Sequence, residues 1–178
     1  MATQTLRPNG AGSLTNWTAN GLPSNYQCVN EGIADNDTTY LDFTGAGTNK
    51  TDLYTIDSNS IGATDTINSI TVYAVVRMVT TGRLISSSVA LCIKENGTTT
   101  QGSTQSLILT SYVTKSNTWT VKPSNGSAFT QTDITNLEIG VYGIQSNTQN
   151  CRCTQVYVVV DYTPSGGSVS KLALLGVG

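Results

Sequence analysis

The sequence predicts an all-β protein, an antiparallel β-sandwich of jelly-roll type with one short helix. Two long stretches, residues 66–79 and 151–163, alternate with a period of two, which is typical of strands and not of helices. Clusters of Asn, Gly and Pro separate further short runs rich in Val, Ile, Thr and Tyr. About nine strands at this spacing, with one short helical crossover, indicate a sandwich. An immunoglobulin-like Greek key is the second choice among sandwiches.

The two long stretches are expected to be central strands of the fold. Their β-branched and aromatic residues suit a pleated surface that packs on both sides. In residues 151–163, Val156, Val158 and Val160 fall on one face, and Tyr157, Val159 and Asp161 fall on the other.

The shorter elements follow from the same pattern and from local turn chemistry. Pro8 to Gly12 is expected to break the first strand. Asn96-Gly97 predicts a type I′ hairpin turn, because both residues tolerate a positive φ angle. A helix is predicted over residues 130–137, with Thr130 as N-cap and Asp133 three positions later. Shorter strands are expected at residues 3–7, 26–29, 40–43, 52–56, 86–94, 105–113, 117–121 and 136–145.

The composition indicates a globular protein with an unusually uncharged surface. Of the 178 residues, 38% are hydrophobic and only 11% are charged, against roughly 25% charged in an ordinary soluble protein. Thr, Ser, Asn and Gln must therefore build the polar surface. Such a surface can pack against copies of itself without charge repulsion, which favours an extracellular or particle-associated protein.

Charge and hydropathy exclude two classes of partner. The nine Lys and Arg residues are scattered and the net charge is −2, so we expect no nucleic-acid partner. No run of eighteen apolar residues is present, so we expect no membrane span. The N-terminus lacks a basic region followed by an apolar one, so we expect no signal peptide.

The residues available for catalysis argue against an enzyme. The chain has no histidine, which removes the Ser-His-Asp and Cys-His nucleophile systems and histidine-ligated zinc. A glycosidase would need two facing carboxylates, and nothing singles out such a pair. Cys151 and Cys153 are expected to be free buried thiols, with a bond to Cys28 or Cys92 as the alternative.

A polar loop carries the one candidate metal site. Glu31, Asp35 and Asp37 place carboxylates on a loop at spacings that suit a hard cation such as Ca²⁺. The pattern lacks the Gly and the distal Glu of an EF-hand loop. Asn and Asp also bond their own backbone in turns, which accounts for them without an ion. We therefore expect no cofactor, with calcium as the alternative.

Several aromatic residues could stack on sugar rings. The alternative is that they close the ends of the sandwich as buried side chains. The candidates are Trp17, Tyr26, Tyr112, Trp119 and Tyr142.

The chain divides into a sandwich domain, residues 1–163, and a linker with an apolar arm, residues 164–178. Pro164 to Ser168 is expected to be a flexible linker. The segment after it is more apolar than a free tail should be, so we expect it to pack on a neighbouring subunit or partner, or else to form a last strand of the domain. The expected contact residues are Leu172, Leu174, Leu175 and Val177.

Several further motifs stand out along the chain: Thr5–Asn9, Trp17, Tyr26–Val29, Asp35–Tyr40, Asp52–Tyr54, Ile67–Tyr73 and Cys153–Tyr162. Together they resemble a β-sandwich module of tailed-phage accessory virion proteins, such as head-decoration proteins. The resemblance covers most of residues 3–163. The resemblance implies a structural, many-copy protein with no catalytic residues, which is assembled in the host cytoplasm and resides in the virion. Its implied partners are copies of itself and a capsid or other virion protein. Two alternatives stay open: a carbohydrate-binding module of a tail fibre or adhesin, and a self-assembling filament subunit.

Overall fold

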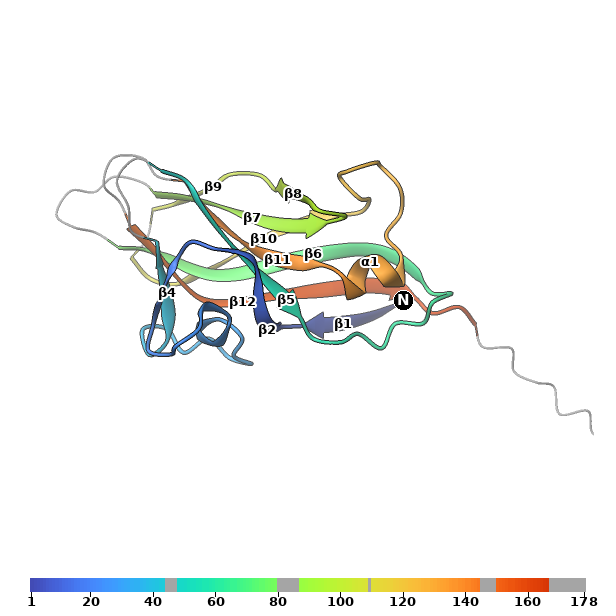
Figure 1. Ribbon diagram of the computed structural model, residues 1–178, viewed down its shortest axis with the longest axis horizontal. Helices are drawn as coiled ribbons and strands as arrows, with labels where there is room; N and C mark the ends of the chain where they lie inside the picture. Colours follow the sequence, from blue (N-terminus) through green and yellow to red (C-terminus); the bar gives the residue numbers. More distant parts are fainter. Residues whose placement is uncertain (44–47, 80–86, 109, 145–149, 167–178) are drawn as a thin grey trace, which may run out of the picture.

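The computed structural model describes residues 1–43, 48–79, 87–108, 110–144 and 150–166. These residues form two six-stranded antiparallel sheets, here called sheet A and sheet B, that pack face to face (Figure 1). The predicted all-β, jelly-roll-like sandwich is confirmed. No helix in the described ranges is long and apolar enough to cross a membrane.

Sheet A is built on the two long strands. They are 14 residues each and pair antiparallel from Asn150 opposite Val79 to Thr163 opposite Thr66, side by side along the molecule (Figure 1). The prediction that they are central is therefore confirmed. The strand order is β10 (Val113–Trp119), β6 (Thr66–Val79), β12 (Asn150–Thr163), β4 (Tyr40–Phe43) and β3 (Thr18–Asn20), and β1 (Ala2–Leu6) pairs with the other half of β12.

Sheet B contains the predicted hairpin. Asn96 and Gly97 have φ angles of 48° and 79°, so the residues chosen for a type I′ turn adopt the positive φ that this turn requires. The strand order is β2 (Pro8–Thr15), β5 (Lys50–Ile56), β11 (Glu138–Ile144), β7 (Ser87–Glu95) and β8 (Thr98–Gln101), and β9 (Gln105–Leu107) pairs with the other half of β7.

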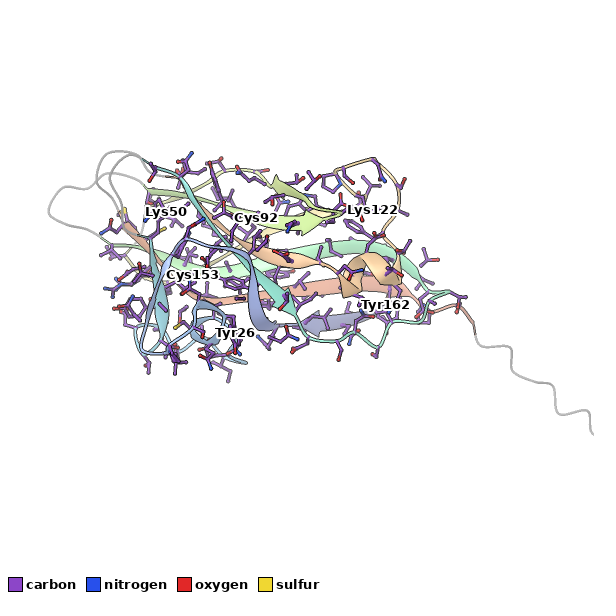
Figure 2. All side chains as sticks on the ribbon, viewed as in Figure 1. Tyr26, Lys50, Cys92, Lys122, Cys153 and Tyr162 are labelled. Carbon is purple, nitrogen blue, oxygen red and sulfur yellow. The ribbon has the colours of Figure 1, made fainter. Side chains whose placement is uncertain are left out.

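The core lies between the sheets and comes from the inward residues of the long strands. Val156, Val158 and Val160 are fully buried, as their alternation predicts. Burial of one such side chain stabilises the fold by roughly 1.5–3 kcal/mol. All four cysteines are free and buried, which confirms the thiol prediction; Cys92 and Cys153 are labelled in Figure 2.

The predicted helix is confirmed as α1 (Gln131–Thr135). Thr130 and Asp133 form a reciprocal capping box, in which each side chain accepts a hydrogen bond from the other residue's backbone N–H. Lys122 adds an ion pair to Asp133, with Nζ 3.0 Å from Oδ2. The strand predicted at residues 26–29 is wrong, because this segment forms the 3₁₀ helix η1 (Asn25–Cys28).

The first strand ends before Pro8, as predicted, but the residues of the predicted break form a new strand in the other sheet. Residues 8–15 form β2, which pairs with β5 through two register irregularities. Gly12 lies so close to β5 that a Cβ atom there would meet the backbone carbonyl of Leu53 at 2.5 Å. Glycine at this position therefore allows the backbones of β2 and β5 to approach closely, because it has no Cβ atom.

The single strand predicted over residues 105–113 is divided in the structure. β9 ends at Leu107 and pairs in sheet B, whereas β10 begins at Val113 and pairs in sheet A. One strand cannot hydrogen-bond in both layers, so the chain leaves the β conformation where it crosses between them. Ile108, at this crossing, is 70% exposed.

Candidate functional site

The outer face of sheet A, the face turned away from the core, carries the candidate site. On β6 and β12 the residues that alternate with the buried ones are partly exposed. They include two arginines, Arg77 and Arg152, and two tyrosines, Tyr73 and Tyr157. Because these strands form the centre of the sheet, the backbone of Tyr73 and Arg152 is paired with a neighbouring strand on both sides. The backbone of Arg77 and Tyr157 is paired on the side where β6 and β12 meet.

Three charged residues lie in one line across the sheet, and we call them the charged row. Asp42 of β4 is opposite Arg152 of β12, which is opposite Arg77 of β6. The Nε of Arg152 donates to Asp42 Oδ1 at 2.9 Å. Arg152 and Arg77 are like charges in directly paired positions, an arrangement that is destabilising without an anion nearby.

Asp37 supplies that anion from the loop of residues 30–39. Its carboxylate lies 2.9 Å from Arg77 Nη2 and 2.9 Å from Arg152 Nη1. Burial raises the pKa of Asp37, but hydrogen bonds from Arg152, Arg77 and Tyr112 outweigh burial and lower the pKa below its usual value. Asp37 is therefore charged at neutral pH and links the two guanidinium groups.

Each arginine of the charged row rests on a tyrosine ring. The guanidinium carbon of Arg152 is 4.0 Å from the ring centroid of Tyr40, and that of Arg77 is 5.3 Å from Tyr112. The hydroxyl of Tyr112 is also 3.0 Å from Asp37 Oδ1. Burial and the Asp37 carboxylate raise the pKa of Tyr112, while Arg77 opposes this. The two rings attract the guanidinium groups and so favour their positions on this face.

A β-bulge in β12 holds the 30–39 loop above the row. The register between β12 and β6 shifts between Cys153 and Gln155, next to Thr154. The Thr154 hydroxyl lies 3.0 Å from Asp35 Oδ1, and Gln155 Nε2 donates to the carbonyl of Glu31 at 2.6 Å. Both ends of the loop are thus tied to the strand that carries Arg152.

Tyr73 and Tyr157 form a stacked pair further along the same face. They are opposite each other in register, with ring centroids 4.9 Å apart and planes at 9°. The guanidinium of Arg7 lies over the Tyr157 ring at 5.4 Å, and its Nη1 donates to the carbonyl of Glu31 at 2.7 Å. This pair lies four residues from Arg77 along β6, which corresponds to about 13 Å of extended strand.

The three predicted cation ligands have protein partners in the structure. Thr39 Oγ1 is 2.8 Å from Glu31 Oε1 and 2.9 Å from Asp35 Oδ2, so these two carboxylates share a hydroxyl, whereas Asp37 turns to the arginines. Burial raises the pKa of Glu31. In the described part of the chain, no three His, Cys, Asp or Glu side chains gather so as to hold a metal ion. The calcium alternative stays a prediction.

The aromatic residues named from the sequence are divided between core and surface. Trp17 and Trp119 are only 4% and 8% exposed, so neither ring is free to stack on a sugar. Tyr112 lies beside the charged row, and Tyr142 lies on the outer face of sheet B. Sequence reasoning missed Tyr73 and Tyr157 as a pair, although each occupies an outward position of a long strand.

The predicted contact residues of the arm lie outside the described residues. These are Leu172, Leu174, Leu175 and Val177.

The side chains of this face offer ring surfaces and hydrogen bonds. The guanidinium groups donate, the carboxylates accept, and tyrosine hydroxyls do both. These groups suit the binding of a polar, hydroxyl-rich molecule.

Comparison with known proteins supports the fold. No protein-family model and no curated protein sequence matches the chain. A solved structure of Clostridium thermocellum xylanase 10B, containing CBM22-1 and GH10 modules with bound xylohexaose, aligns with a TM-score of 0.52 at 9% identity. The alignment covers 86% of this chain and 26% of that chain, so this chain spans about a quarter of the xylanase structure.

Two further structures align less well. A family 16 carbohydrate-binding module aligns with a TM-score of 0.38 at 12% identity, covering 70% of this chain and 78% of that one. Bacteriophage CBA120 tailspike protein 4 aligns with a TM-score of 0.43 at 10% identity, covering 89% of this chain and 19% of that one. At such identities the likeness concerns the fold alone.

Proposed function

We propose that this protein is a non-catalytic carbohydrate-binding module that binds a glycan along the outer face of sheet A. The observation that carries the proposal is the placement of the Tyr73–Tyr157 pair and the charged row on one face of the two longest strands. Strand-borne sites are held more precisely than sites on loops, which reduces the entropy lost on binding.

The chemistry of this face matches that of a sugar chain. A pyranose ring presents C–H groups that pack on aromatic rings and hydroxyl groups that exchange hydrogen bonds with polar side chains. The tyrosine pair supplies apolar ring surface with hydroxyl groups, and the charged row supplies oriented donors and acceptors. Carbohydrate binding is also the property named for a module of the xylanase structure whose fold this chain resembles.

The test compares the wild type with variants in affinity gel electrophoresis against a panel of neutral and acidic polysaccharides. For a retained polysaccharide, we expect the double variant Tyr73→Ala/Tyr157→Ala to bind at least about tenfold more weakly, since a central aromatic contact contributes about 2 kcal/mol. Tyr142→Ala removes a comparably exposed tyrosine from sheet B and should bind like the wild type.

A conservative variant separates binding from folding. Tyr157→Phe keeps the ring that stacks on Tyr73 and should retain most of the affinity, while thermal unfolding reports the stability of each variant. Absence of binding to every polysaccharide, or equal loss in Tyr142→Ala, would contradict the proposal.

A virion structural protein, such as a capsid decoration protein, is the second candidate. It is supported by the resemblance to phage accessory modules and by a surface with few charges: at the edge of sheet A, β10 exposes Thr114, Ser116 and Thr118. Light scattering and negative-stain microscopy test it. A decoration protein should form a closed oligomer that requires residues 165–178, and a filament subunit an open assembly. A monomer at every concentration contradicts both.

A further inference from the structure

We infer that Arg77 and Arg152 form a carboxylate-binding subsite that Asp37 fills from within the protein, so that an acidic sugar binds by displacing Asp37. This inference rests on the proposed function. It assigns the ligand class, a glycan that contains a uronic acid, and it gives Asp37 the role of an internal competitor.

The position of the two arginines requires an anion between them. They are paired directly across β6 and β12 with their side chains on the same face. Arginine stays protonated at all physiological pH values, so their repulsion cannot be relieved by loss of a proton. Stacking on Tyr112 and Tyr40 keeps each guanidinium in place whichever carboxylate lies between them.

Asp37 does not use the full hydrogen-bonding capacity of this pair. Arg77 reaches both oxygens of Asp37 through the same nitrogen, Nη2, at 2.9 and 3.1 Å, and Arg152 reaches Asp37 through Nη1 alone. A bidentate arginine–carboxylate pair uses two nitrogens in parallel. The Nε of Arg77 is buried and has no hydrogen-bond partner among the described residues. A carboxylate with freer geometry can therefore bind this pair better.

Asp37 is also the part of the cluster that can move. Its side chain is 52% exposed, whereas those of Arg77 and Arg152 are 17% and 22% exposed. Exposed ion pairs contribute little net stability. The 30–39 loop is anchored to β12 through Asp35 and Glu31, so the Asp37 side chain can turn outward while the loop stays attached.

The experiment compares Asp37→Ala with Asp161→Ala by calorimetric titration. Asp161 lies on the same face of β12 as Arg152 and carries the same charge as Asp37. Its carboxylate accepts a hydrogen bond from Asn68 and does not contact the arginine pair. The probes are polygalacturonate and the same polymer with its carboxylates methyl-esterified. We expect Asp37→Ala to bind polygalacturonate about tenfold more tightly than Asp161→Ala does, the gain expected if Asp37 fills the subsite about nine-tenths of the time.

The esterified polymer should show no such difference, and adding Arg152→Ala to Asp37→Ala should remove the gain. Equal polygalacturonate affinities for Asp37→Ala and Asp161→Ala would overturn the inference. Any gain over the wild type would then come from the loss of one negative charge and not from the release of the arginine pair. If neutral glycans bind while this equality holds, the proposed function survives and only the inference fails.

A second measurement decides the inference if no polymer binds and the proposed function fails. Free galacturonate and galactose are titrated into ¹⁵N-labelled Asp37→Ala, and the arginine Nε–H signals are followed by NMR. Shifts of the Arg77 or Arg152 signal with galacturonate, and none with galactose, support the subsite. No shift with either sugar overturns it.

Discussion

Replacement of Asp52 by alanine tests the polar interior of the sandwich. Asp52, on β5, is fully buried. Its carboxylate accepts hydrogen bonds from Trp17 N–H at 3.1 Å, Asn25 Nδ2 at 2.9 Å and the Tyr54 hydroxyl at 2.8 Å. These bonds join η1 and the segment around Trp17 to sheet B.

The Asp52→Ala variant leaves two buried donors, Trp17 N–H and the Tyr54 hydroxyl, and the partly buried Asn25 amide without their acceptor. Each such donor costs about 1–3 kcal/mol, and removal of a buried charge offsets part of the loss, so we expect a net destabilisation of about 3 kcal/mol. Urea unfolding followed by far-UV circular dichroism measures it. Asp57→Ala, which removes an exposed carboxylate, is the matched control and should cost less than about 1 kcal/mol.

The pH dependence of this deficit gives a second, independent check. Burial raises the pKa of Asp52 above its usual value, although hydrogen bonds from Asn25, Trp17 and Tyr54 oppose this. A raised folded-state pKa means that the group stabilises the fold most below its unfolded-state pKa, and that this contribution is lost as the pH rises through the folded-state pKa. The deficit of Asp52→Ala should therefore be larger in acid than at neutral pH. A deficit under about 1 kcal/mol, or one that grows toward neutral pH, refutes the reasoning.

Three further predictions concern thiols, strand contact and acid stability. The four thiols should not react with a disulfide reagent until the protein is unfolded, because all are buried and burial raises the pKa of Cys151 to about 12; a fast-reacting thiol in the folded protein contradicts this. Gly12→Ala should lower stability by about 1–3 kcal/mol in urea unfolding, because its Cβ would meet the backbone of Leu53; an unchanged midpoint contradicts it. Burial raises the pKa of Glu138, but hydrogen bonds from Ser13 and Lys94 outweigh burial and lower it, so its contribution is present above the unfolded-state pKa and lost as the pH falls through the folded-state pKa. Glu138→Gln should thus be less stable than the wild type at pH 7, with the gap closing in acid; a gap that stays constant with pH contradicts this.

Local signals in the sequence predicted much of the fold. The capping box of Thr130 and Asp133 and the turn at Asn96-Gly97 depend on residues within a few positions of one another, and both form as expected. The long strands were also predicted, because their alternation extends over 14 residues. Elements that are determined by residues close together in the sequence were therefore predicted correctly.

The failures arise where distant parts of the chain decide the conformation. The glycines of β2 were interpreted as a break, because nothing nearby in sequence shows that β5 lies against them. The candidate site has the same difficulty: Asp37 is 40 residues from Arg77 and 115 from Arg152, so no local pattern brings them together. The sequence named Asp37 as a cation ligand, and only the fold shows its arginine partners.

The central claim is that the outer face of sheet A binds carbohydrate, and NMR mapping tests it most directly. An oligosaccharide of any retained polysaccharide is titrated into the ¹⁵N-labelled protein, and backbone amide shifts are followed. We predict that the largest shifts fall on β6 and β12 around Tyr73, Tyr157 and Arg152. Shifts confined to sheet B, or the absence of any shift, would contradict the claim.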